Sequence, residues 1–352
     1  EGLMEFNTDY YKRYGLTAKF STKLTDQLTA SYSMRFLSDE YQRPSSLTNS
    51  FFIDLGRQGW PTLPLYDPNG YLYSSPSPAL NMRDGGIDNN QKDFSYHQLQ
   101  LVFEPLKGWK TFGDFNYRSN TVFRHWDTQL TYNHNVAGNP IASGTTSEIF
   151  ESGFRQNYFN VNLYSEYSKT IAEKNNFKVM AGFQSEYTKN RDLSAQRRGI
   201  VIPELPSLDL TTGFNNGQTA VPGVNGKYLN VATQGVFGRL NYDYDGRYLL
   251  EANLRYDASS RFRSDTRWDL FPGVSAGWNI ARESFMSNLA NVVNTLKFRA
   301  SYGELGNQNV SEQTTVALYP TYLNVPFGAA NGNWLQNGAK PNTAGAPNPI
   351  ST

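Results

Sequence analysis

Apolar and polar residues alternate along long stretches of this chain, and the alternation is clearest between residues 233 and 309. Leu250 and Leu254 fall on one parity, whereas Glu251 and Asn253 fall on the other. Successive side chains of a strand point to opposite faces, so the pattern predicts strands with one apolar and one polar face. Each run is about a dozen residues long, which exceeds the usual globular strand and suffices to cross a bilayer at a tilt. We therefore expect the apolar face to meet lipid.

The alternating runs come in pairs that are joined by short turns. The pairs are Tyr11–Thr22 with Leu28–Ser38, Phe94–Glu104 with Lys110–Phe123, Gln156–Lys169 with Phe177–Lys189, Thr233–Tyr244 with Tyr248–Ser259, and Phe271–Ala281 with Leu296–Glu304. The connection within the last pair, Arg282–Thr295, is longer and is expected to hold a short helix.

The connections between these hairpins are mostly long. They are Asp39–Asp93, Tyr132–Arg155, Asn190–Ala232, the shorter Ser260–Leu270, and the chain from Leu305 onward. Long structureless loops count against a compact soluble domain. Short periplasmic turns that alternate with long extracellular loops are typical of outer-membrane barrels. The sequence thus predicts an all-β protein, an antiparallel transmembrane β-barrel that contributes about ten strands here.

The composition agrees with this fold without requiring it. Only 38% of the 352 residues are apolar, yet 14% are aromatic. Soluble domains are usually about 45–50% apolar, and disordered chains are poor in aromatic rings. Few aliphatic and many aromatic residues suit a barrel with an outward apolar band, aromatic girdles and a polar interior. A soluble β-sandwich with one wet face alternates in the same way and stays an alternative.

Charge and cysteine content exclude several other classes. The net charge is +1 and no block of Lys and Arg occurs, so we expect no nucleic-acid partner. The chain has no cysteine, which excludes a disulfide framework and cysteine-ligated metals. We find no apolar run of about 18 residues and expect no transmembrane helix.

The two ends of the chain suggest a piece of a longer protein. The chain opens with Glu1 and a strand-like segment, and Gly328–Thr352 has the Gly, Pro and Asn content of a loop. An open sheet in lipid would leave two edges of unpaired backbone groups, each costing several kcal/mol. Either the barrel closes with further strands outside this sequence, or this segment closes as a small barrel. The abrupt ends favour the first.

One motif resembles a catalytic nucleophile but lacks its partners. Gly273–Gly277 matches the G-x-S-x-G letters, with Ser275 at the centre. That motif requires a strand-to-helix turn and a histidine later in the chain. The three histidines all precede Ser275; they are His97, His125 and His134. Acidic residues are scattered and no H-x-x-x-H spacing occurs, so we expect no enzyme activity, no metal site and no cofactor.

Asp243–Gly246 has two interpretations, a calcium loop and a hairpin turn. A calcium loop that begins at Asp243 needs a bidentate Glu at its twelfth position, where the sequence has Leu254. Asp-Gly between two alternating runs is instead a strong signal for a tight hairpin turn. We expect a turn.

The remaining functional candidates are aromatic residues expected in loops. They are Trp60, Tyr66, Tyr71, Trp126 and Trp334, with Tyr73 and Tyr132 nearby. Flat rings can stack on sugar faces or on peptide side chains, but they equally anchor loops or lie in the membrane interface. The sequence does not decide among these roles, so substrate-binding residues stay unassigned.

Three runs share both letters and spacing with a known family. They are FGRLNYDYDGRYLLEANLRYDASSRF (Phe237–Phe262), RWDLFPGVSAGWNIARESF (Arg267–Phe285) and LKFRASYGELGNQ (Leu296–Gln308). This part of the chain resembles the barrel of the SusC/RagA family of TonB-dependent outer-membrane transporters from Bacteroidetes. Before Thr233 the resemblance is one of layout only.

The resemblance implies a 22-stranded barrel in the bacterial outer membrane that is filled by an N-terminal plug. Residues 1–352 would be part of that barrel, without the plug, the N-terminal extension and the final strands. The implied function is active import of glycan or peptide oligomers. The implied partners are a SusD-like surface lipoprotein over the mouth, the TonB complex acting through a region absent here, and outer-membrane lipid. A dimer of transporter–lipoprotein pairs is also implied. A passive porin-type channel and a soluble or surface-attached β-rich glycan-binding module are the alternatives.

Overall fold

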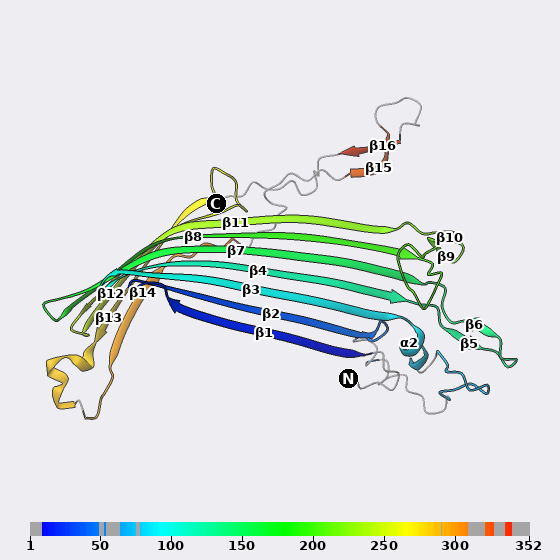
Figure 1. Cartoon of the computed structure of the whole chain (residues 1–352), viewed down its shortest axis with the longest axis horizontal. Coiled ribbons are helices and arrows are strands. Elements are labelled where there is room, and N and C mark those ends of the chain that lie inside the picture. Colours follow the sequence, from blue (N-terminus) through cyan, green and yellow to red (C-terminus); the bar gives the residue numbers. More distant parts are fainter. Residues whose placement is uncertain are drawn as a thin grey trace.

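A single long sheet of ten antiparallel strands dominates the computed structural model (Figure 1). The structure describes residues 9–48, 53, 64–74, 78–289, 291–308, 321–326 and 335–339. In spatial order the strands are β1 (Tyr10–Lys23), β2 (Leu28–Pro44), β3 (Ile87–Leu106), β4 (Trp109–Thr128), β7 (Glu148–Ile171), β8 (Asn175–Arg198), β11 (Gly223–Tyr244), β12 (Tyr248–Ser259), β13 (Trp268–Asn279) and β14 (Lys297–Gly303). Each strand of the sheet pairs with its predecessor along the chain, as expected for consecutive hairpins.

Smaller elements gather at the two ends of the strands. The loop end carries α2 (Ala79–Asp84), β5 (Tyr132–His134) with β6 (Pro140–Ala142), and β9 (Phe214–Asn215) with β10 (Gln218–Thr219) (Figure 1). The tight-turn end carries the 3₁₀ helices η1 (Ile280–Arg282) and η2 (Ser284–Leu289), which confirm a short helical segment in the last connection. A separate two-stranded sheet joins β15 (Thr321–Pro326) to β16 (Leu335–Ala339). Among the described residues, no helix is both long and apolar enough to cross a membrane.

The register of the sheet collects the apolar parities of all ten strands on one face. Leu163 lies opposite Phe183, which in turn lies opposite Val236. Further along, Leu240 pairs with Ala252. Directly opposed residues share a face, so these pairings join the separate apolar rows into one surface. We call it the outward face, and the opposite one the polar face.

The outward face is uncovered. Phe20 on β1 is 64% exposed and Leu254 on β12 is 48% exposed. A sandwich would require a second sheet of similar size against these side chains. The other sheets in the described part of the chain have two strands each, too few to cover ten. The sandwich alternative is therefore wrong for this sheet.

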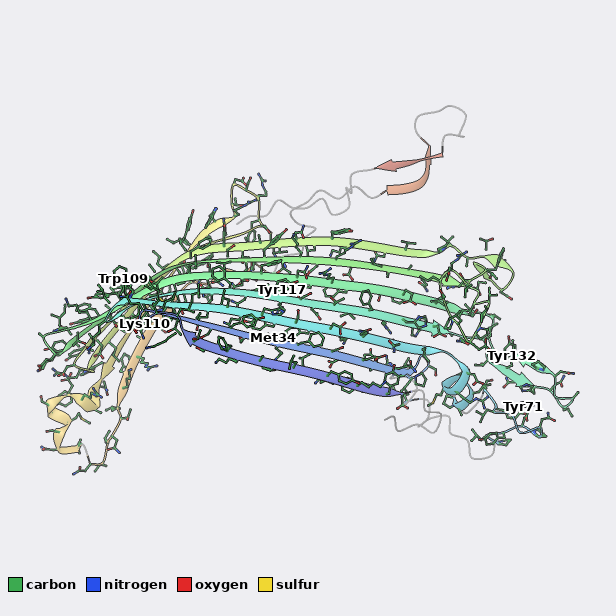
Figure 2. The ribbon with its side chains drawn as sticks, viewed as in Figure 1. Met34, Tyr71, Trp109, Lys110, Tyr117 and Tyr132 are labelled. Atoms are coloured by element: carbon green, nitrogen blue, oxygen red, sulfur yellow. The ribbon has the colours of Figure 1, made fainter. Side chains whose placement is uncertain are left out.

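The apolar residues of the outward face form a band of nearly constant height. On β7 the band runs from Phe159 to Tyr167, which is about 26 Å along the strand at ~3.3 Å per residue. At the tilt of about 40° typical of barrels this corresponds to about 20 Å across the membrane, close to the ~25 Å band of outer-membrane barrels. Trp109 lies at the tight-turn end of the band and Tyr117 at its other edge (Figure 2). Aromatic residues thus border the band, as girdles do.

The strands continue well beyond this band on the loop side. The sequence predicts strands of about a dozen residues, whereas β7 and β8 each have 24. The expected loops were therefore too long: β8 extends to Arg198, and β11 begins at Gly223 rather than Thr233. Above the band polar and charged residues such as Asn157 and Arg155 enter the outward parity, so the alternation fades from the sequence while the backbone pairing continues.

Two local predictions concern the turn at Asp245 and the Ser275 motif. Asp245 and Gly246 both have positive φ, 53° and 65°, as a type I′ hairpin turn requires. An Asp243 carboxylate oxygen accepts the Gly246 backbone N–H at 2.6 Å, which confirms the turn. Ser275 lies inside β13, opposite Glu251 on one side and Ser301 on the other. It is not on a strand-to-helix turn, so the nucleophile interpretation has no geometric support.

Candidate functional site

The polar face of the sheet carries hydrogen bonds that run across neighbouring strands. On β3 and β4, Gln100 donates to Asp114 at 2.7 Å, and the Tyr96 hydroxyl donates to Asn116 at 2.8 Å. Asn116 continues the row by donating to Asn160 on β7 at 2.8 Å. Polar groups satisfied in this way hold fixed positions. The face therefore presents a rigid, hydrophilic wall.

Charged side chains on the same face are paired across strands or along one strand. Lys178 on β8 lies 2.9 Å from Glu166 on β7, whereas Arg255 lies 2.9 Å from Asp257 on the same strand, β12. Asn241 on β11 donates to Glu251 on β12 at 2.6 Å. This arrangement leaves little net charge and many donors and acceptors. Such a wall suits contact with water, with hydroxyl-rich molecules or with another polar protein surface.

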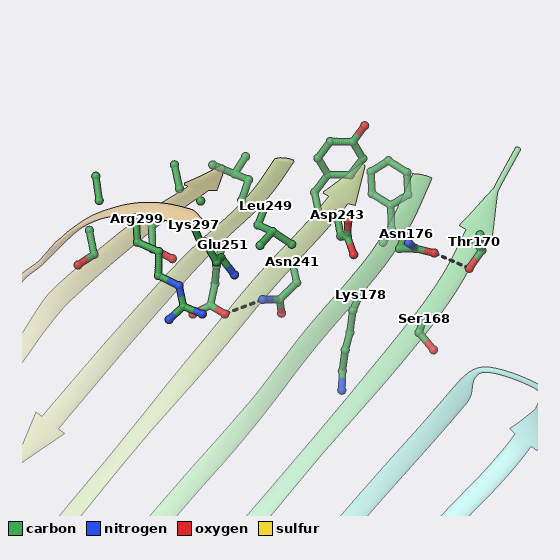
Figure 3. A pocket seen from close by; sticks show the side chains of 18 of the residues that line it. Ser168, Thr170, Asn176, Lys178, Asn241, Asp243, Leu249, Glu251, Lys297 and Arg299 are labelled. Atoms are coloured by element: carbon green, nitrogen blue, oxygen red, sulfur yellow. Dashed lines mark hydrogen bonds between the residues drawn. The ribbon is translucent and has the colours of Figure 1, made fainter. Parts of the chain in front are cut away.

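A hollow of about 760 Å³ lies on this face near the tight-turn end. Figure 3 shows side chains from neighbouring strands around it. Lys178, Lys297 and Arg299 supply cations, and Asp243 and Glu251 supply anions among them. The hollow is open and polar, and it lies at the end of the strands away from the long loops.

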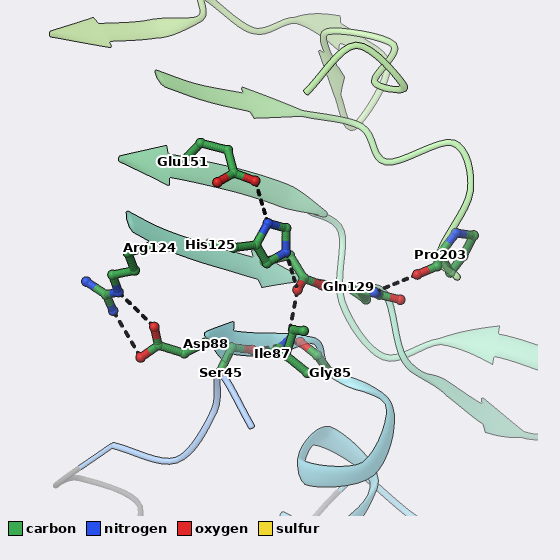
Figure 4. Close-up of polar contacts among 10 residues, drawn as sticks. Ser45, Gly85, Ile87, Asp88, Arg124, His125, Gln129, Glu151 and Pro203 are labelled. Carbon is green, nitrogen blue, oxygen red and sulfur yellow. Dashed lines mark hydrogen bonds and ion pairs between the residues drawn. The ribbon is translucent and has the colours of Figure 1, made fainter. Parts of the chain in front are cut away.

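An ion-pair cluster marks the opposite end of the polar face, beyond the apolar band. Asp88 at the start of β3 accepts from Arg43 on β2 at 2.9 Å and from Arg124 on β4 at 2.7 Å (Figure 4 shows the Arg124 pair). Burial alone would raise the pKa of Asp88, but the hydrogen bonds from the two guanidinium groups outweigh it, so the pKa lies below its usual value. The cluster has two cations and one anion, which leaves a net positive charge at the rim.

His125 forms a second polar node at this end, on the outward face of β4. Its ring contacts Glu151 at 2.5 Å and the fully buried Asp127 at 3.2 Å (Figure 4). Hydrogen bonds with Asp127 and Glu151 raise the pKa of His125 to about 9, against the opposing effect of burial. The ring is therefore charged at neutral pH. Asp127 also accepts the Ile87 backbone N–H at 3.0 Å, which joins the β2–β3 loop to this strand end.

The sequence that forms this two-faced sheet is similar to a known family. The model of the TonB-dependent receptor-like β-barrel family matches residues 19–346. The chain belongs to this family. It is 29% identical over 239 residues to TonB-dependent receptor P39 of Formosa agariphila, which covers 66% of this chain and 21% of that protein. It is also 29% identical over 216 residues to TonB-dependent receptor SusC of Bacteroides thetaiotaomicron, which covers 55% of this chain and 20% of that protein.

Solved structures show the same fold. The RagAB peptide transporter superimposes with a TM-score of 0.71 at 18% identity, over 96% of this chain and 37% of that one. The RagAB peptide importer in its open-open state gives 0.72 at 19% identity, over 96% and 36%. The chain spans about a fifth of the two curated relatives named above. These findings confirm the resemblance to the SusC/RagA family and assign this TonB-dependent receptor barrel to the outer membrane.

The aromatic candidates of this TonB-dependent receptor chain fall in different places. Tyr71 stacks on His134 of β5 with ring centroids 3.7 Å apart, so it joins two loops at the end of the strands (Figure 2). Tyr66 pairs with Leu72 through an isolated bridge and keeps an exposed ring. Both arrangements show loop anchoring, and ligand contact by these rings stays a prediction.

Trp126 is not in a loop, contrary to the expectation from sequence. It lies within β4, in register with Asp88 on one side and Phe150 on the other. The reason is the extension of the strands beyond the band, which carries Trp126 onto the polar face beside the arginine cluster. Trp60 and Trp334 lie outside the described residues.

The sequence did not reveal the rim cluster of this TonB-dependent receptor chain. Arg43 and Asp88 are 45 positions apart, and Arg124 follows Asp88 by 36. None of the three belongs to a motif, and all lie in or next to segments expected to be loops. Only the register of β2, β3 and β4 brings them together.

Proposed function

We propose that this chain forms part of the barrel wall of an outer-membrane importer for nutrient oligomers, glycans or peptides. The observation that carries the proposal is the two-faced sheet: one exposed apolar face of bilayer height, and behind it a rigid polar wall. Membership of the TonB-dependent receptor family supports active transport rather than catalysis or passive diffusion. The uncovered apolar face disfavours the soluble glycan-binding module.

In this proposal residues 1–352 are one section of a 22-stranded barrel. The free edges of β1 and β14 pair with further strands of the transporter, because unpaired backbone groups in lipid would cost several kcal/mol each. A barrel of that size is too wide to stay open, so a plug domain fills it. The polar wall and the hollow around Glu251 and Lys297 supply the donors and acceptors that the plug contacts.

The loop end faces the cell exterior and meets a SusD-like lipoprotein. The strands project beyond the band there, and the Tyr71–His134 stack and the His125 node connect neighbouring loops. A connected rim of this kind offers a surface on which a partner can seat. The TonB complex supplies energy from the other side, through a region outside residues 1–352. Pairs of transporter and lipoprotein assemble as dimers.

Uptake measurements on the full-length transporter test this function. Cells that carry or lack its gene are supplied with labelled glycan and peptide oligomers, with and without an uncoupler of the proton gradient. An importer gives uptake that requires both the gene and the gradient. Gene-dependent uptake that continues after uncoupling would instead identify a passive channel, and gene-independent uptake of every oligomer would refute import of these classes.

A further inference from the structure

Three cations gather on the outward face just above the apolar band. They are Arg155 on β7 with Lys189 and Arg191 on β8, and all three side chains are exposed. We call this group the outer basic patch. The parity of each residue matches that of the band residues Phe159 and Tyr187, so the patch faces the membrane side rather than the polar wall.

The patch places like charges directly against each other. Arg155 lies opposite Arg191 in the β7–β8 register, and Lys189 is two residues from Arg191 on the same face. Like charges opposed across two strands are destabilising. Within the described part of the chain, none of the three forms an ion pair with a carboxylate. Lys189 lies over the ring of Tyr187 and Arg191 over the ring of Tyr228, each at 5.2 Å.

Other cations on the same two strands have partners. Arg198 contacts Glu148 at 2.7 Å and Lys178 contacts Glu166 at 2.9 Å, both on the polar face. Asp93 on β3 lies in the same cross-strand row as Arg155, but β4 lies between them. The Asp93 carboxylate accepts a hydrogen bond from Ser38 at 2.6 Å. The missing counter-ion is therefore a local property of the outer basic patch.

The position of the patch indicates what supplies the missing charge. Arg191 follows Tyr187, the last band residue of β8, by four positions, which is about 13 Å along the strand. At a tilt of ~40° this is about 10 Å above the hydrocarbon, and long cationic side chains can reach back toward it. The polar headgroup layer extends about 5–8 Å beyond the hydrocarbon, so side chains that reach back by a few ångströms enter it. A second element of the site is the amide of Asn157, directly opposite Lys189.

We propose that the outer basic patch binds the phosphate group of a lipid in the outer leaflet. The two guanidinium groups each offer paired N–H donors that match phosphate oxygens, and Lys189 adds a point charge. The acyl chains of the same lipid lie along the band below, against Phe159 and Tyr187. Such a lipid would relieve the repulsion between Arg155 and Arg191 and fix the transporter at a defined height in the membrane.

Native mass spectrometry of the full-length transporter in detergent tests the proposal. The probes are phosphorylated lipid A and the same lipid after enzymatic removal of its phosphate. We expect the wild type to retain the phosphorylated form and to lose the dephosphorylated one. We expect Arg155→Gln/Arg191→Gln to lower retention about tenfold or more, because each lost charged hydrogen bond is worth roughly that factor. Arg155→Lys/Arg191→Lys keeps the charge and should give an intermediate value.

A matched control removes the same charge from the other edge of the band. Lys107 and Lys169 are exposed lysines at the tight-turn end, and Lys107→Gln/Lys169→Gln should retain lipid A as the wild type does. Equal losses in both double variants would overturn the assignment, as would equal retention of the two lipid forms by the wild type. Inorganic phosphate that binds as tightly as the lipid would show a free anion site instead. If a variant fails to assemble, the retention of phosphorylated against dephosphorylated lipid A by the wild-type protein still tests the proposal.

Discussion

A charge placed on the outward face should destabilise the barrel, whereas the same charge one residue away should not. Leu254 points outward from β12, opposite Gly238 and Pro272, and lies two residues from Ala252, the midpoint of the band that runs from Tyr248 to Tyr256 on this strand. Its side chain is 48% exposed and meets lipid. Leu254→Arg would bury a guanidinium in hydrocarbon, which costs roughly 2–4 kcal/mol near the bilayer centre.

Asn253 is the matched control because it points to the polar wall. It donates to Glu251 at 2.8 Å and accepts from Arg239 at 2.6 Å, so an arginine at position 253 would keep a carboxylate within reach. It would also face the Arg239 guanidinium across the strands, which costs about 0.2–1 kcal/mol. We therefore expect Asn253→Arg to change stability by less than about 1 kcal/mol, as exposed pairs do. The expected difference of about 2 kcal/mol or more corresponds to roughly 30-fold or more in the equilibrium between inserted and unfolded protein.

The assay is reversible denaturant unfolding of the full-length transporter in lipid vesicles, with heat-modifiable gel mobility as a measure of assembled barrel. Leu254→Arg should lower the unfolding midpoint and the assembled fraction, and Asn253→Arg should leave both near the wild-type values. Equal stability of the two variants would refute the facing assigned to β12. Because the register ties the strands together, it would also undermine the outward face as a whole.

Two further predictions concern positions whose environments the structure defines. His125 has a pKa raised to about 9, above its unfolded value of about 6.5, so its contribution to stability is fully present below pH 6.5 and is lost as the pH rises toward 9. We expect the free energy of unfolding to fall over this window by about 1–3 kcal/mol, seen as a lower thermal midpoint, and His125→Gln to remove that pH dependence; an unchanged profile in the variant would contradict the ion pairs. Gly182→Ala should cost about 1–3 kcal/mol in denaturant unfolding, because an added Cβ would lie 2.5 Å from Phe237 and 2.6 Å from Tyr164. Gly238→Ala is the control, since the nearest atom there is the Met180 carbonyl oxygen at 3.7 Å; equal costs would show that backbone propensity rather than crowding decides.

The transmembrane part of the fold could be predicted because the bilayer imposes a simple rule. Each spanning strand must show lipid-compatible side chains on one parity over a fixed length, so Phe159, Val161 and Leu163 reveal both the strand and its outward face. The Asp245-Gly246 turn was equally local, since two positive φ angles leave few residue choices. The resemblance to the family was carried by the strands between Phe237 and Gln308.

The candidate site was harder to predict because its parts lie above the membrane. There both faces are wet, so strand extension leaves no periodic signal, and Trp126 was expected in a loop although it lies on the polar face beside Asp88. The arginine cluster and the His125 node join residues from three or more segments. No local sequence pattern indicates which residues of such distant segments lie next to each other.

The sequence by itself determined which residues of each strand face lipid, where the tight turns lie and which family the chain resembles. These features depend on neighbours within a dozen positions, where alternation and turn chemistry act directly. Only the tertiary structure decided the register in which the strands pair and how far they extend beyond the apolar band. That register opposes Arg155 to Arg191 and encloses Asp88 between Arg43 and Arg124. Pairing between distant segments depends on the summed backbone hydrogen bonds of whole strands, which no single stretch of sequence displays.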